Sequence, residues 1–152
     1  MSEHPIELLL VEDSPRDAEL TLLAFEDMRF ANKVHLVRDG EEALEFVFAT
    51  GRYAGRDMDR GPRVVLLDLK LPKVDGLEVL RRIRSDPRTR TLPVVVLTSS
   101  NQERDITEAY ALAVNSYIVK PVDFDRFAQS IRDLGLYWMV LNEPPLEPRE
   151  AR

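Results

Sequence analysis

Five short apolar runs, separated by longer segments of mixed polarity, are the feature of this sequence that most limits its fold. Each run is rich in Val, Ile and Leu and lacks the alternation of apolar and polar residues that is typical of a sheet with one solvent-exposed face. Such runs are typical of strands buried on both faces of a parallel sheet covered by helices. They are Ile6–Val11, Val34–Val37, Val64–Leu67, Val94–Leu97 and Tyr117–Val119.

The segments between the runs carry helix-start signals. In four of them a residue that can cap a helix is followed three residues later by an acid, at Ser14, Asp39, Asp75 and Ser100. Asp39–Gly40 also fits a hairpin turn, but the helical spacing of the apolar residues after it favours a helix. Strand and helix then alternate five times. We therefore predict an α/β fold, a doubly wound five-stranded parallel sheet with helices on both faces.

The 152 residues fit one domain with one core. We expect this domain at residues 1–142, with an extended C-terminal helix, and an irregular tail at 143–152. A polar segment, Gly51–Pro62, is expected to form a loop. The apolar stretch Tyr137–Leu141 either folds back onto the core or forms a subunit interface. We favour the interface, and hence a homodimer through the C-terminal helix region.

Composition excludes several classes of function. The net charge of −6 argues against a surface that binds nucleic acid, so the arginines of residues 81–90 indicate a solvated face. The absence of Cys excludes disulfides, thiolate zinc sites and thiol catalysis. We find no signal sequence and no apolar run near the roughly 20 residues of a membrane span. We expect a cytoplasmic protein without membrane contact. His4 and His35 have no partner at metal-ligand spacing.

Polar side chains stand at the carboxyl ends of four predicted strands, the edge where open parallel sheets bind their ligands. Glu12 and Asp13 follow the first strand, and Asp68 follows the third. Thr98 stands at the end of the fourth strand, and Lys120 follows the fifth. Three acids, a hydroxyl and an ammonium are therefore expected to converge on one edge of the sheet.

Clustered carboxylates repel one another unless a hard cation with oxygen ligands neutralises them. We expect Mg²⁺ (or Mn²⁺) to be bound by Asp13 and Asp68, with Glu12 acting through water. A carboxylate that attacks phosphorus forms an aspartyl phosphate, and in-line phosphoryl transfer depends mainly on positioning and charge neutralisation. In such a site Lys120 supplies positive charge opposite the metal, and Thr98 donates a hydrogen bond to a phosphoryl oxygen.

Four motifs fall in register between about Ile6 and Leu134. They are Leu9–Ser14, Leu67–Pro72 with Asp75–Gly76, Pro93–Thr98 and Lys120–Pro121. In this combination the chain resembles the receiver domains of bacterial two-component response regulators. The enlarged loop Gly51–Pro62 and the extension through Leu136–Trp138 resemble the stand-alone response regulators associated with phytochromes.

The resemblance implies a flavodoxin-like strand order, 2-1-3-4-5, and a role for each matching residue. Glu12 and Asp13 are the acidic pair, Asp68 is the phosphoacceptor, Thr98 is the switch hydroxyl and Lys120 is the family's lysine. The resemblance further implies the Lys70 main-chain carbonyl as a metal ligand, Tyr117 as the aromatic switch residue, and a cis bond before Pro121.

The expected function is therefore that of a single-domain response regulator, a phosphoacceptor rather than an enzyme with a separate substrate. A sensor histidine kinase, with a bacteriophytochrome as one candidate, donates a phosphoryl group to Asp68 in a Mg²⁺-dependent reaction. Thr98 is then drawn toward the phosphoryl oxygen and Tyr117 follows inward. These movements switch the surface of the fourth helix, fifth strand and fifth helix for partner binding or dimerisation.

Three alternative functions stay open on the sequence. An interaction module of the same fold without phosphorylation is one, although such a module should have lost at least one site residue. A flavin-binding electron carrier should have a glycine- and hydroxyl-rich first loop, whereas Glu12–Pro15 repels an anion unless a metal intervenes. A phosphatase with an aspartyl nucleophile should carry an acid two residues after Asp13, where Pro15 stands.

Overall fold

All five predicted runs contribute strands to one sheet in the computed structural model, which describes residues 6–30, 33–143 and 145. The strands lie in the order β2-β1-β3-β4-β5, and all four pairings are parallel. This confirms the predicted fold class and strand order. The strands are β1 (Leu8–Val11), β2 (Val34–Val37), β3 (Val64–Leu67), β4 (Val94–Thr98) and β5 (Ser116–Val119).

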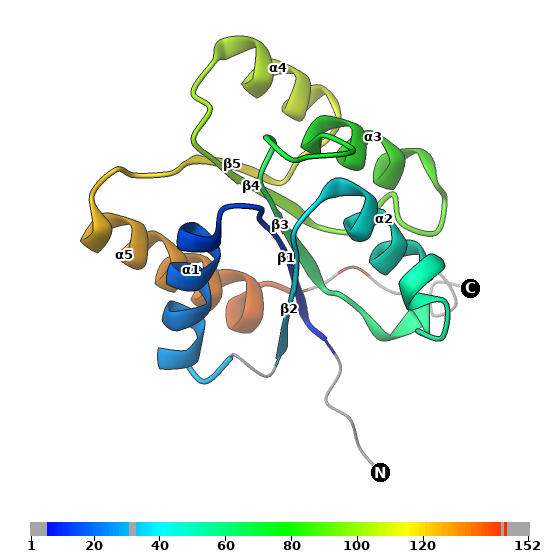
Figure 1. The fold of residues 1–152 in the computed structure, drawn as a ribbon, viewed down its shortest axis with the longest axis horizontal. Helices are drawn as coiled ribbons and strands as arrows, with labels where there is room; N and C mark the ends of the chain where they lie inside the picture. The colour runs from blue at the N-terminus through cyan, green and yellow to red at the C-terminus, as the bar shows by residue number, and fades with distance from the viewer. Residues whose placement is uncertain (1–5, 31–32, 144, 146–152) are drawn as a thin grey trace.

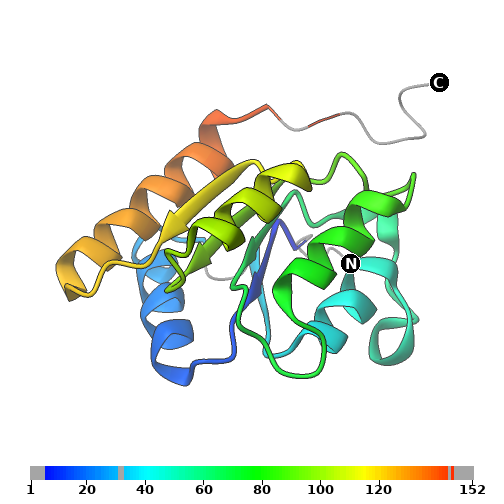
Figure 2. The ribbon, with the colours of Figure 1, turned by 90° about the horizontal axis from the view of Figure 1, so that it is seen from above.

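Helices cover both faces of the sheet. The first and last helices lie on one face, and the three others lie on the opposite face (Figure 1; Figure 2). The connections run from strand to helix to the next parallel strand, as in other doubly wound folds. The helices are α1 (Pro15–Asp27), α2 (Gly40–Phe48), α3 (Gly76–Ser85), α4 (Glu103–Ala111) and α5 (Phe124–Gly135).

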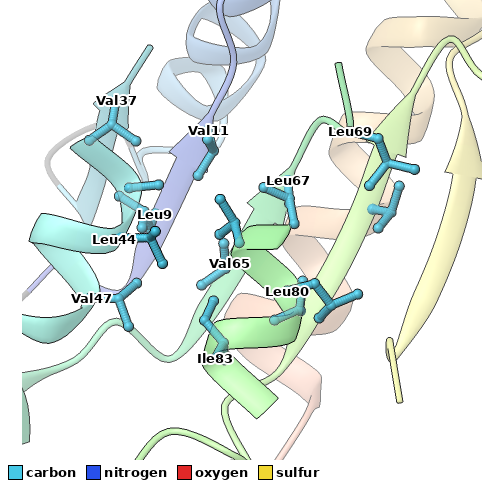
Figure 3. Close-up of a cluster of buried hydrophobic side chains, with 14 of the residues drawn as sticks. Leu9, Val11, Val37, Leu44, Val47, Val65, Leu67, Leu69, Leu80 and Ile83 are labelled. Carbon is cyan, nitrogen blue, oxygen red and sulfur yellow. The ribbon is translucent and has the colours of Figure 1, made fainter. Parts of the chain in front are cut away.

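Every residue of β1, β3 and β4 is buried, which explains why these runs lack polar alternation. Successive side chains point to opposite faces. Leu9 and Val65 therefore pack with Leu80 of α3 in one cluster (Figure 3). Leu8 and Leu10 belong to the second cluster, on the side of α1 and α5. Two cores thus hold the middle strands in place, and with them the residues that follow those strands.

Three of the four predicted helix caps are confirmed. Ser14, Asp39 and Asp75 precede α1, α2 and α3, and each side chain accepts a hydrogen bond from the main-chain N–H three residues later. Gly76, which follows Asp75, lies so close to β3 that an added Cβ would sit 2.5 Å from the Asp68 carbonyl oxygen. The start of α3 is therefore packed directly against the strand end that carries Asp68.

The predicted cap at Ser100 is wrong. Helix α4 begins at Glu103, with Gln102 as its cap residue and no side-chain hydrogen bond at the cap. The Ser100 side chain is buried, and its hydroxyl donates to the Asp105 carboxylate instead. Two residues, Asn101 and Gln102, separate Ser100 from the first residue of α4.

The segment Gly51–Pro62 is irregular as expected but contains two 3₁₀ turns, η2 (Gly51–Tyr53) and η3 (Met58–Arg60). Arg56 fastens the segment to α2, because its guanidinium donates to the Phe46 carbonyl and stacks 4.1 Å from the Phe46 ring centroid. The Gly61–Pro62 bond is cis. The expected cis bond before Pro121 is wrong: that bond is trans, the favoured state of most X-Pro bonds.

Helix α5 continues directly into η4 (Leu136–Leu141), a stretch of π-helix, and both views show one continuous rod (Figure 1; Figure 2). Most of the expected tail, residues 143–152, lies outside the described residues, as does His4. Among the helices that the structure describes, none combines the length and apolar character needed to cross a membrane.

Candidate functional site

The ends of four strands bring the predicted site residues to one edge of the sheet. Main-chain hydrogen bonds extend the strand pairing by one residue at Asp68, whose N–H donates to Val11, and at Lys120, whose N–H donates to Thr98. These bonds fix the main-chain positions of Asp68 and Lys120 relative to the neighbouring strands. Asp68, Thr98 and Glu12 are buried at this edge, whereas Asp13 is exposed.

The Lys120 ammonium lies at the centre of the site. Its Nζ is 2.7 Å from Glu12 Oε1, 2.8 Å from Asp68 Oδ2 and 2.8 Å from Asp17 Oδ2. Only 7% of the Lys120 side chain is exposed. An ammonium has three N–H donors, and these three contacts with carboxylates use all of them. The structure therefore places Lys120 within the acidic cluster and not in solvent.

Asp68 accepts hydrogen bonds on both carboxylate oxygens. Thr98 Oγ1 lies 2.9 Å from Asp68 Oδ1, and the Lys70 main-chain N–H also donates to Oδ1, at 3.1 Å. Oδ2 is bonded to Lys120. The Thr98 hydroxyl is fully buried, so its contact with Asp68 is shielded from water. The predicted pair of phosphoacceptor and switch hydroxyl is thus in direct contact.

The surroundings shift the pKa values of the two buried acids in opposite directions. Burial raises the pKa of Glu12 to about 7, against the hydrogen bond from Lys120. Burial also acts to raise the pKa of Asp68. There, the hydrogen bond and charge of Lys120, with the donors of Lys70 and Thr98, outweigh burial and lower it. Asp68 therefore stays ionised at neutral pH.

The same contacts act on Lys120. Burial alone would lower its pKa, but the hydrogen bonds to Asp17, Asp68 and Glu12 raise it well above the usual range. The ammonium is therefore protonated at neutral pH.

Glu12, Asp13 and Asp68 fit a divalent cation. One carboxylate oxygen from each can be chosen so that all three lie within 4.8 Å of one another. Among the described residues, none forms a hydrogen bond or ion pair with the Asp13 carboxylate, which is therefore available to a ligand. Both Glu12 oxygens are engaged, by Lys120 and by the Ser14 N–H. This donor set of oxygens is the kind that Mg²⁺ and Mn²⁺ prefer.

A surface groove adjoins the acidic cluster. Asp13 and Lys70 line its near end, and Arg104, Asp105 and Glu108 of α4 line its far end. The exposed side of the site therefore opens toward α4.

Tyr117, the predicted aromatic switch residue, is connected to the same region. Its hydroxyl donates to the Ser100 main-chain carbonyl at 2.9 Å, and its ring is half-buried against the core. The Ser100 N–H lies 3.4 Å from Thr98 Oγ1. Ser100 therefore links Tyr117 and Thr98 through two main-chain contacts.

Asp17 is a member of the site that was not predicted from the sequence. Asp17 is the third residue of α1 and fits the ordinary role of an acid in a first helical turn. Its contact with Lys120 joins residues 103 positions apart. The available signal was geometric, because the first turn of the helix after β1 lies beside the end of that strand.

Comparison with known proteins gives one family. The model of the response regulator receiver domain matches residues 8–132, which is most of the chain and all five strands.

Individual relatives cover nearly the full length of the chain. The probable methanogenesis regulatory protein FilR2 of Methanothrix harundinacea is 42% identical over 95% of this chain and 90% of its own. The structure of the phosphorylated cyanobacterial phytochrome response regulator RcpA has 38% identity and a TM-score of 0.85, covering 91% of this chain and 97% of that one. The Mn²⁺-bound structure of response regulator Rcp1, a protein of Synechocystis, has 34% identity and a TM-score of 0.82, covering 91% and 98%.

Proposed function

Because this chain belongs to the response-regulator receiver domain family of two-component signalling, we propose that Asp68 accepts a phosphoryl group from a partner histidine kinase. The contact that carries the proposal is the Lys120 ammonium bonded to Asp68 and Glu12 at a buried sheet edge. An acidic cluster with its own internal cation, beside an exposed Asp13, suits transfer of an anionic group better than flavin binding.

In the proposed step an Asp68 carboxylate oxygen forms a bond to phosphorus. The phosphorus–nitrogen bond of the kinase phosphohistidine breaks, and the imidazole leaves with the electrons of that bond. Lys120 offsets negative charge on the transferred group, and Thr98 donates a hydrogen bond to one of its oxygens. The chain thereby promotes its own phosphorylation, and the hydrolysis of the aspartyl phosphate, without a separate substrate.

Asp13, Asp68 and the Lys70 main-chain carbonyl would hold the divalent metal, with Glu12 acting through water. Glu12 fits an indirect role, because Lys120 and Ser14 already engage its two oxygens. When bound, Mg²⁺ or Mn²⁺ supplies positive charge that offsets the carboxylates and the incoming phosphoryl oxygens. The Mn²⁺-bound state of the relative Rcp1 supports this assignment.

Phosphorylation would change the hydrogen-bond partner of Thr98 from Asp68 Oδ1 to a phosphoryl oxygen. Because the two side chains are already 2.9 Å apart, Thr98 needs only a small displacement. Through Ser100 that displacement would alter the hydrogen bond of Tyr117 and bias the surface of α4, β5 and α5 between two states. This surface would carry the output to a partner.

The direct test is labelling by a small phosphodonor with Mg²⁺. Wild type and the control Asp125→Asn, an exposed acid of α5, should both become phosphorylated, and Asp68→Asn should not. Labelling of Asp68→Asn at the wild-type rate would defeat the proposal. Absence of labelling in wild type would favour the alternative of a receiver fold that acts only as an interaction module.

For the kinase partner we infer a photosensory kinase of the phytochrome type. RcpA, which matches most of this chain, is named as a phytochrome response regulator. FilR2 is named for methanogenesis, so the relatives include a second signalling context. Phosphotransfer from a red-light-responsive kinase should be much faster than from an unrelated sensor kinase. Equal rates from the two kinases would count against the assignment.

For the assembly we propose a homodimer through η4. Met139 is buried and Trp138 packs on the core, so part of this stretch does fold back. Four neighbouring apolar side chains nevertheless stay 49–64% exposed: Leu136, Tyr137, Val140 and Leu141. An apolar group of this kind, continuous along one helix, is suited to a second copy of the same surface.

Sedimentation tests the dimer. Val140→Glu with Leu141→Glu should shift the protein toward monomer and leave Met139 in place. Tyr110→Glu, an equally exposed residue of α4, is the control and should leave the mass distribution unchanged. If the η4 variant sediments like wild type, this interface is wrong.

A further inference from the structure

The contact between Lys120 and Asp17 differs in kind from the other two contacts of this ammonium. Glu12 and Asp68 stand at strand ends and belong to the acid group that can hold a cation, together with Asp13. Asp17 comes from α1 and is outside that group. Among the described residues, Lys120 is the only cation within 4.0 Å of the Asp17 carboxylate.

Two of the three partners of Lys120 are therefore shared with the metal site. A cation at Glu12, Asp13 and Asp68 draws on the same carboxylates that hold the ammonium in the structure. Asp68 would then bind the metal directly and Glu12 would serve it through water, so Asp17 is the one carboxylate partner of Lys120 that the metal does not use. Without that anchor, a four-carbon side chain would lose its fixed position and the entropy of its rotamers would oppose the productive geometry.

Asp17 is held well enough to act as such an anchor. The N–H of Asp17 donates to the Ser14 hydroxyl at 3.2 Å, and its carbonyl accepts from the Thr21 hydroxyl at 2.7 Å. Pro15 at the first helical position restricts the backbone of this turn. The Asp17 side chain is 22% exposed, and its ion pair with Lys120 is therefore partly shielded from solvent.

We propose that Asp17 is a positioning residue that holds the Lys120 ammonium over the site while Glu12 and Asp68 serve the metal and the phosphoryl group. The inference rests on the proposed phosphorylation of Asp68. Asp17 touches neither the metal nor the reacting atoms and acts only through Lys120. In an ordinary helix-capping role, by contrast, its effect would be independent of the lysine.

A double-mutant cycle separates the two roles. The four proteins are wild type, Asp17→Asn, Lys120→Met and the double variant. Two quantities are measured on each: the Mg²⁺ dissociation constant by calorimetry, and the rate of phosphorylation by a small phosphodonor at saturating Mg²⁺. Asp125→Asn removes a first-turn acid from α5 and controls for the loss of an acid near a helix N-terminus.

With Lys120 present, Asp17→Asn should slow phosphorylation about tenfold, the size of coupling found within one hydrogen-bond network. It should also weaken Mg²⁺ binding, because Lys120 then rests more on Glu12 and Asp68. In the Lys120→Met background the same change should alter either quantity less than about twofold, because Asp17 has then lost the residue through which it acts and the effects of coupled residues are not additive. Asp125→Asn should match wild type.

The results distinguish this inference from the proposed function. If wild type is not phosphorylated at all, the proposed function fails. If wild type is phosphorylated and Asp17→Asn matches it in both quantities, only the role of Asp17 fails. Equal losses in both lysine backgrounds would also overturn it, because Asp17 would then act without Lys120. If the Lys120→Met proteins are phosphorylated too slowly for their rates to be compared, the Mg²⁺ dissociation constants of the four proteins decide between the two roles of Asp17.

Discussion

Lys120 Nζ lies 2.8 Å from Asp68 Oδ2, although the two residues are 52 positions apart in the chain. Both side chains are only 7% exposed. The proposed phosphoacceptor is therefore held beside a cation that the fold itself supplies, and removal of that cation is expected to have a measurable effect.

Lys120→Met leaves buried carboxylates without their ammonium. We expect the free energy of unfolding of the metal-free protein to fall by about 3 kcal/mol, since removing one partner of a buried ion pair leaves the other charge buried without compensation. Mg²⁺ should restore much of this loss and should raise the melting temperature more than in wild type. The control is Lys73→Met, because the Lys73 ion pairs are on the surface and contribute about 0.5 kcal/mol or less. Equal Mg²⁺ stabilisation of Lys120→Met and wild type would contradict the arrangement.

Asp13→Asn should separate metal binding from stability. Its carboxylate is exposed and carries no hydrogen bond from the described residues, so its loss removes repulsion within the cluster without breaking a contact. We expect unchanged or slightly higher metal-free stability, and Mg²⁺ affinity weaker by about tenfold or more, as for loss of a ligand or its support. Calorimetric titration measures the affinity. Glu19→Gln, an exposed acid of α1, should bind Mg²⁺ as wild type does, and Asp13→Asn behaving the same way would exclude Asp13 as a ligand.

Thr98→Val keeps the shape of the side chain and removes its donor to Asp68. Stability should fall by about 1 kcal/mol, the usual net contribution of a hydrogen bond. Asp68 should still accept a phosphoryl group, but the NMR signals of Tyr117 should no longer respond to phosphorylation. Thr89→Val is the matched control, because Thr89 is also a buried threonine and its hydroxyl donates to a main-chain carbonyl away from the site. A normal Tyr117 response in Thr98→Val would show that Thr98 is not the switch.

The partly buried position of His35 predicts a pH dependence of the free energy of unfolding that is unrelated to phosphorylation. Its ring stacks on Phe46, its Nε2 lies 3.0 Å from the Tyr53 hydroxyl, and that hydroxyl donates to Glu42. Burial lowers the pKa of His35 from its ordinary 6.5; Glu42 opposes this shift, and Arg56, on the same aromatic cluster, adds to it.

The sign of the effect follows from the lowered pKa. The unfolded chain binds the His35 proton more readily than the folded protein, so stability is lost as pH falls below 6.5 and through the folded pKa. Chemical denaturation at several pH values measures the slope. His35→Gln should flatten it, while Tyr53→Phe should retain a histidine-dependent slope. An unchanged slope in His35→Gln would assign the pH dependence to other groups.

Much of the fold could be predicted because the buried strands consist of Val, Ile and Leu. A strand covered on both faces tolerates few polar residues, so Val64–Leu67 stands out from any helical pattern. The site followed from the same fact, since parallel strands deliver Asp68 and Lys120 to one edge. The prediction needed no side-chain geometry.

The parts that failed depend on local competition between hydrogen bonds. Ser100 has the sequence of a helix cap, but Asp105 engages its hydroxyl and α4 starts later. Asp17 has the sequence of an ordinary first-turn acid, and only the three-dimensional approach of Lys120 gives it a further partner. Neither outcome is visible in spacing alone, because one depends on a residue that is distant in the sequence but close in the tertiary structure, and the other on a competing hydrogen-bond acceptor.

The most direct test of the account is to locate the phosphoryl group chemically. Wild-type protein is incubated with a small phosphodonor, with and without Mg²⁺, and its peptides are analysed by mass spectrometry after trapping of the acyl phosphate. The account predicts a single modified carboxylate, Asp68, only when the metal is present. Modification at another residue, or equal modification of Asp68 without a divalent cation, would contradict it.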